Sequence, residues 1–220
     1  MKITRIENQK KRPARKNIFA DGEFLIGVGA ETLIAFGLRT GDEIAPETLR
    51  ALQKTEEELG ARNAALRFLS ARPRSIREVR DRLREKEFGD EEIAKTIAEL
   101  TRAGLLDDDA FARIYIRNAR VVRPAGKVLI KQKLVLLGVP KELIDTALAE
   151  EFSAEDHAAD AAKAAAGFLK KASAARRKEE PFKLKQRLTA YLLRRGYTWD
   201  VVSPVVKRMV PRGDQAEPES

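Results

Sequence analysis

The chain has 220 residues, with 43 Lys and Arg against 34 Asp and Glu, a formal net charge of +9 and no cysteine. The lack of cysteine excludes disulfides and thiolate zinc sites, and the single histidine, His157, excludes histidine dyads and histidine-rich metal sites. No apolar run reaches the roughly 20 residues of a membrane span, and residues 1–16 lack the apolar core of a secretory signal, so we expect a cytoplasmic protein with an anionic partner.

Residues 1–44 predict a small β-rich extension that differs from the rest of the chain. Residues 3–6 are β-prone, and a basic run occupies residues 10–16. Asp21-Gly22 lies between two apolar segments and is a strong signal for a β-hairpin. A short helix over 31–38 is expected to close the extension.

The first long helix is predicted over residues 46–71. Pro46 suits the first turn of a helix because its missing N–H would have no intrahelical partner. Gly60 is expected to break or bend this helix. Ser75 and Glu78 have the spacing of a capping box, which predicts the start of the next helix.

An apolar pattern with gaps of four, five and nine residues recurs three times and predicts an internal repeat. The first two positions of each copy are expected to face inward from one helix, the third to pack at a turn, and the fourth to lie on the next helix. The copies are Val79, Leu83, Phe88 and Ile97; Ile130, Leu134, Val139 and Leu148; and Leu188, Leu192, Tyr197 and Val206.

A further helical segment precedes each copy, so the repeating unit is predicted to be a three-helix module. The lead-in helices are expected at 48–71, 108–122 and 154–176. The resulting organisation is an extension (1–44), three helical repeats (45–106, 107–152 and 153–210) and a disordered tail (211–220).

The sharpest local motif runs from Gly104 to Ala112 and includes Asp107, Asp108 and Phe111. Gly104 suits the left-handed position that ends a helix, and Asp107 or Asp108 can cap the next helix. The alternative is a carboxylate site for Mg²⁺ or Ca²⁺. Because three consecutive carboxylates point in different directions, we interpret them as caps and predict no metal site.

Basic residues recur at helical spacing along two stretches of the chain, and two interpretations are open. One is a solvated face paired with Asp and Glu, and the other is a surface for phosphates or an acidic protein groove. No acidic residue falls between Arg113 and Glu142, which predicts unpaired positive charge and favours binding. The candidate binding residues are Arg74, Arg77, Arg80, Arg84, Arg113, Arg117, Arg120, Arg123, Lys127, Lys131 and Lys133.

Motifs of catalysis are missing from the sequence. There is no phosphate loop, no nucleophile elbow and no pair of catalytic carboxylates, and residues 27–33 lack the spacing of a dinucleotide fingerprint. We therefore predict a protein that is not an enzyme and needs no cofactor.

Three stretches between Arg72 and Glu151 resemble the RecX family of recombination regulators. The first opens with Arg74, Ser75 and Glu78. The second holds Gly104, Leu106, Asp107, Asp108, Phe111 and Ala112. The third places Gly126 before a basic helix that closes with Leu134, Gly138 and Val139.

The resemblance implies a mainly α-helical, curved and elongated body of three repeats. It also implies a protein that docks in the groove of the filament of RecA and single-stranded DNA and represses RecA's ATPase, strand-exchange and coprotease activities. We expect the chain to be a monomer. Two other readings stay open: a basic module that binds single-stranded or duplex DNA without a protein partner, and an adaptor for an acidic protein.

Overall fold

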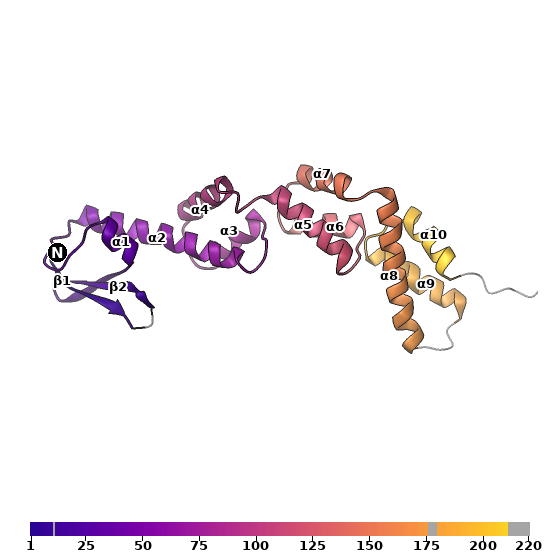
Figure 1. Ribbon diagram of the computed structural model, residues 1–220, viewed down its shortest axis with the longest axis horizontal. Helices are drawn as coiled ribbons and strands as arrows, with labels where there is room; N and C mark the ends of the chain where they lie inside the picture. The colour runs from indigo at the N-terminus through magenta and orange to yellow at the C-terminus, as the bar shows by residue number, and fades with distance from the viewer. Residues whose placement is uncertain (11, 176–179, 211–220) are drawn as a thin grey trace, which may run out of the picture. The chain divides into compact units, whose positions relative to one another are not determined.

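The computed structural model describes residues 1–10, 12–175 and 180–210 (Figure 1). This part of the chain is mainly helical, with a small sheet at its N-terminal end, as predicted. The predicted tail, 211–220, lies outside the described residues. The strands are β1 (Ile3–Gln9), β2 (Arg12–Ala20) and β3 (Glu23–Gly29), and the helices are α1 (Ala30–Ala35), α2 (Pro46–Leu69), α3 (Ile76–Arg84), α4 (Asp90–Arg102), α5 (Asp108–Val121), α6 (Lys127–Leu136), α7 (Lys141–Glu151), α8 (Ala154–Ala175), α9 (Pro181–Arg194) and α10 (Trp199–Met209).

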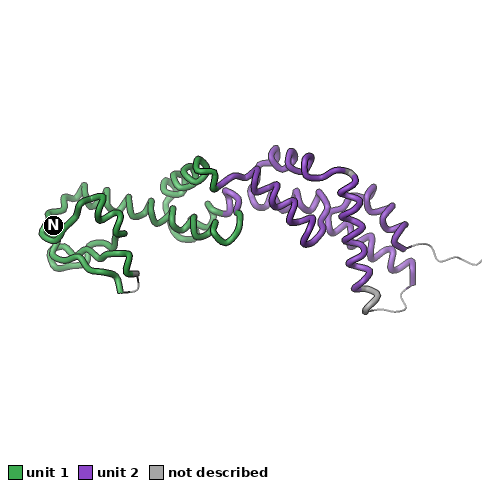
Figure 2. The backbone as a smooth tube through the Cα atoms, viewed as in Figure 1, with its two compact units in different colours: residues 1–73, 79–105 green, residues 74–78, 106–220 purple. Residues whose placement is uncertain are grey.

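The chain divides into two compact units, coloured separately in Figure 2. The first unit holds residues 1–73 and 79–105, and the second holds residues 74–78 and 106–220. The first turn of α3 thus belongs to the second unit, although the rest of that helix belongs to the first. None of the described helices is long and apolar enough to cross a membrane.

The sheet of the first unit is antiparallel with β2 in the middle. The predicted hairpin is confirmed: Ala20 pairs with Glu23, and Asp21 and Gly22 both adopt positive φ, at 51° and 91°. The basic run of residues 10–16 lies largely in β2, which the sequence reading had not assigned to a strand. A buried cluster of Ile3, Ile18, Val28, Ile44 and Leu52 connects the sheet to α2.

Helix α2 runs through Gly60 without interruption, so the helix does not break there. The glycine is explained by packing, since a Cβ at Gly60 would lie 3.2 Å from the ring of Phe88. A Cβ there would meet the ring more closely than is usual, so the ring would have to shift by a few tenths of an ångström.

The three-helix repeat is confirmed by a turn that occurs three times. The residues before the third template position are Glu87, Gly138 and Gly196, and all three are left-handed, with φ of 63°, 81° and 83°. Each donates its N–H to the carbonyl three residues earlier at 2.9 Å. The next residue in each copy bonds back to the carbonyl five residues earlier, which completes the helix-ending motif that favours glycine.

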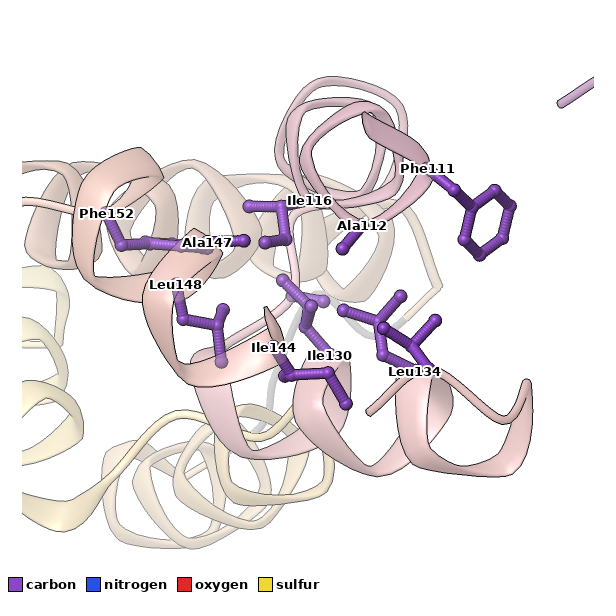
Figure 3. Close-up of a cluster of buried hydrophobic side chains, with 11 residues drawn as sticks. Phe111, Ala112, Ile116, Ile130, Leu134, Ile144, Ala147, Leu148 and Phe152 are labelled. Carbon is purple, nitrogen blue, oxygen red and sulfur yellow. The ribbon is translucent and has the colours of Figure 1, made fainter. Parts of the chain in front are cut away.

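Each of the last two repeats has its own apolar core. All four template positions are buried in both repeats. Figure 3 shows Ile116, Ile130, Leu134 and Ile144 converging between α5, α6 and α7. The corresponding cluster of the third repeat is formed by α8, α9 and α10, and includes Leu188 and Leu192.

Candidate binding surface

Arg113, Arg117 and Arg120 lie along α5, where the sequence predicted unpaired positive charge. Arg113 instead binds Asp109 one turn earlier, at 2.8 Å, and Glu150 of α7. These two carboxylates raise the pKa of the Arg113 guanidinium. One end of the predicted stripe is therefore neutralised within the second repeat.

Arg117 makes a two-pronged contact with Glu151. Its Nε and one terminal nitrogen donate to the two carboxylate oxygens at 2.7 and 2.5 Å. The hydrogen bond from Arg117 holds the pKa of Glu151 below its usual value. The geometry is the planar fork that Arg forms with carboxylates, which a lysine could not reproduce.

Arg120 is the most enclosed of the three and joins α5 to α8. It pairs with Asp156 at 2.6 Å and with the buried Asp160 at 2.7 Å, and it donates to the backbone carbonyl of Glu151. Its guanidinium also lies 4.7 Å from the ring centroid of Phe152. The prediction of an unpaired stripe is thus wrong for all three arginines, because α7 and α8 supply carboxylates that are distant in sequence.

The lysines of α6 are also partly engaged. Lys127 donates to the carbonyl of Phe152 at 3.2 Å, and Lys131 pairs with Asp145. The side chains of Lys133 and Arg123 are exposed, and neither has a hydrogen-bonding or ionic partner among the residues that the structure describes. These two remain available to a partner.

The basic residues at the start of α3 and along it also include both ion-paired and exposed side chains. Arg74 lies 3.3 Å from Glu78, and Arg84 lies 3.1 Å from Asp90. The Arg77 side chain packs along the backbone at Gly138. Arg80 is exposed on the helix surface.

The carboxylates of the Gly104–Ala112 motif act as caps. Gly104 is left-handed at the end of α4, as predicted. Asp107 accepts from the N–H groups of Asp109 and Ala110, at 2.8 and 3.1 Å, and so begins α5. No group of His, Cys, Asp and Glu suited to a metal ion occurs among the described residues.

Asp108 has a role that the sequence reading did not separate from that of Asp107. It is buried, and its Oδ1 accepts the backbone N–H of Ile76 at 2.9 Å. Ser75 and Glu78 form the predicted reciprocal capping box, and the Ser75 hydroxyl also donates to the carbonyl of Leu137 at 2.6 Å. The start of α3 is therefore held by the second repeat.

The start of α6 is held by the third repeat in the corresponding way. Gly126 donates its N–H to the carbonyl of Arg195 at 2.8 Å, and the N–H of Lys127 donates to Nε2 of His157 at 3.1 Å. A Cβ at Gly126 would lie 2.1 Å from the carbonyl oxygen of Gly196, so only glycine fits this approach. The sequence motif contained Gly126 but gave no sign that residues 70 positions later would cover it.

The titratable groups at this junction have structural partners. Burial lowers the pKa of His157, and the nearby Lys127 ammonium lowers it further. Hydrogen bonds from Arg120 and Ser153 lower the pKa of Asp156. A surface cleft of about 360 Å³ lies beside them, lined by Arg117, Arg120, Val121, Asp160 and Lys163. Since the cations that line the cleft are paired with carboxylates, we interpret this junction as a structural contact between the second and third repeats.

Comparison with known protein families matches the chain in four segments. Residues 1–45 match the model described as the regulatory protein RecX N-terminal domain. Residues 61–100, 107–148 and 160–206 match the models for the first, second and third three-helix domains of RecX.

Curated relatives align over nearly the whole chain. The regulatory protein RecX of Clostridium beijerinckii is 32% identical over 211 residues, covering 95% of this chain and 96% of the relative. The Bacillus subtilis protein of the same name is 34% identical over 213 residues, covering 97% of this chain and 79% of the relative.

Solved structures agree with these matches. A crystal structure of regulatory protein RecX superposes with a TM-score of 0.67 at 29% identity, covering 93% of this chain and 98% of that one. The RecX structure from Lactobacillus salivarius, at 21% identity and a TM-score of 0.60, covers 70% of this chain and supports the fold. The chain belongs to the RecX family of regulatory proteins.

Proposed function

We propose that this chain binds the filament of RecA and single-stranded DNA and lowers RecA's recombinase, ATPase and coprotease activities. It would thereby restrain homologous recombination and the SOS response from the cytoplasm. The observation that carries the proposal is the end-to-end match, from the N-terminal sheet through all three repeats, to proteins named as RecX regulators.

We further propose that the protein acts by binding and not by catalysis. Three buried ionisable side chains hold helices together: Asp108 caps the start of α3, Asp160 binds Arg120, and His157 accepts from the start of α6. A helical-repeat protein whose buried ionisable groups are used in this way has its outer surface left for binding, and repeat proteins bind extended partners through such surfaces.

The test is RecA's hydrolysis of ATP on single-stranded DNA, titrated with this protein. A filament regulator should reduce the rate at well below one copy per RecA subunit, because one bound molecule affects several subunits. No loss of activity until the DNA itself is saturated would contradict the proposal.

A general DNA-binding module is the alternative that this titration separates. It predicts affinity for bare DNA equal to that for the filament, and binding that falls steeply with salt, as phosphate-driven binding does. An adaptor for an acidic protein would instead stay bound to its partner after nuclease treatment.

A further inference from the structure

The positive charge of the chain is concentrated in the third repeat, away from the residues predicted to bind. Residues 153–210 hold thirteen Lys and Arg against six Asp and Glu, whereas residues 107–152 hold eight against seven. Two of the six acids, Asp156 and Asp160, are committed to Arg120. The third repeat therefore has a larger excess of cations than the second.

Helix α9 presents much of this charge. It contains no acidic residue and carries Lys183, Lys185, Arg187 and Arg194. Lys183 and Arg194 are exposed and fall 11 positions apart, three turns on one face and roughly 16 Å along the axis. The ion pair of Lys183 with Glu180 is open to solvent, with side chains 66% and 69% exposed, so a phosphate can replace it at little cost.

Aromatic rings accompany these cations. Phe182 is 69% exposed and precedes Lys183 on α9. On the side toward α8, Tyr191 stacks on Phe168 with ring centroids 4.9 Å apart, and the Arg187 guanidinium lies 5.6 Å from the Phe168 centroid. This contact with the Phe168 ring holds Arg187 on the same side of α9 as Lys183 and Arg194.

We propose that the exposed face of α9, defined by Phe182, Lys183, Arg187 and Arg194, binds single-stranded nucleic acid. The cations would contact successive phosphates, and the Phe182 ring would stack on an unpaired base. The exposed ring favours a single strand, because an unpaired base presents a flat face on which the ring can stack. The inference deepens the proposed function by naming a strand-binding face, but its test needs no RecA.

The test measures binding of the full chain to a fluorescein-labelled oligothymidylate by fluorescence anisotropy. The double variant Lys183→Gln/Arg194→Gln should bind about tenfold more weakly, and the slope of log affinity against log salt should fall by about 1.4, near 0.7 for each lost phosphate contact. Phe182→Ala should weaken binding about fivefold or more, and Phe182→Tyr should restore it.

The matched control is Arg50→Gln/Lys86→Gln, which removes the same charge from exposed positions of the first unit. The inference would be overturned if the Lys183→Gln/Arg194→Gln variant bound as tightly as the control. It would also be overturned if the unaltered chain did not bind bare single strands. Equal affinity for a duplex of the same length together with no effect of Phe182→Ala would overturn it as well. If the chain binds strands through α9 but does not inhibit RecA, the inference stands and the proposed function fails.

Discussion

Arg120 shows how a side chain that looks like a binding residue can instead hold a structure together. Its side chain is 20% exposed, and its partner Asp160 is 2% exposed. A carboxylate so deeply placed depends on its cation, since an unpaired buried charge is costly. Arg120 therefore belongs to the interior of the second unit.

Removing Arg120 should destabilise the chain strongly. We expect Arg120→Ala to lower the free energy of unfolding by about 3 kcal/mol, because Asp160 would keep only a long contact to Lys163 at 3.4 Å. Arg123→Ala, at an exposed neighbouring position, should change it by less than about 0.5 kcal/mol. Guanidinium denaturation measures both, and equal effects would contradict the structural role.

His157 should make stability depend on pH near neutrality. Its pKa lies below the ordinary value of 6.5, so the unfolded chain takes up the proton more readily than the folded one. The stabilisation is complete above the unfolded value and is lost as pH falls through the lower folded value.

Denaturation curves between pH 7.5 and about 5 should show this loss, and it should be smaller in His157→Gln. Glutamine keeps an oxygen acceptor for the N–H of Lys127 but does not titrate. A decline of the same size in both proteins would contradict the role of His157, because Glu151 and Asp156, whose pKa values are lowered, lose their stabilisation only at lower pH.

At the scale of helices, glycines show where elements touch. Gly126→Ala should destabilise the chain by about 2 kcal/mol or more, since the new methyl group would meet backbone that cannot move independently. Gly167→Ala is the matched control, because Gly167 lies within α8 with open space around it.

The control substitution should stabilise the chain by about 0.5–1 kcal/mol, the helix preference of alanine over glycine. Thermal unfolding followed by circular dichroism would show the two changes in opposite directions. Destabilisation by both would mean that the Gly126 contact is not specific.

Glu87 occupies the left-handed turn position that glycine holds in the other two repeats. A residue with a side chain is strained there, so we expect Glu87→Gly to stabilise the chain by about 0.5–1 kcal/mol after the entropy of the unfolded glycine is counted. Glu87→Ala, which keeps the strain, serves as the comparison. Equal stability of the glycine and alanine variants would contradict the assignment.

The elements were predictable where local chemistry decides them. Asp21-Gly22 gave the hairpin, Ser75 and Glu78 gave the capping box, and Gly104 gave a helix end. Trp199 on the first turn of α10 is 63% exposed, although it is a large aromatic residue beside a buried core. A sequence pattern does not say which side of a short helix a neighbour will cover.

At the scale of the whole molecule, the order of repeats could be predicted, but the ion-pair partners of the basic residues could not. The stretch between Arg113 and Glu142 lacks acids locally, yet Glu150, Glu151, Asp156 and Asp160 reach its arginines from later helices. Pairing across 30 or 40 residues is a property of packing. The binding role of the predicted stripe therefore stays a proposal. Arg80, Arg123 and Lys133 are exposed, and the solvent-exposed ion pairs of Arg84 and Lys131 can be exchanged for phosphate contacts, as that of Lys183 can.

The left-handed turn that occurs in all three repeats differs in what packs against it. In the second and third repeats its glycine lets an incoming helix start press against the turn, at Arg77 over Gly138 and at Leu129 over Gly196. In the first repeat the same position is Glu87, whose side chain is exposed. Glycine is therefore found where another helix start docks on the turn, and a residue with a side chain stands where the turn is exposed to solvent.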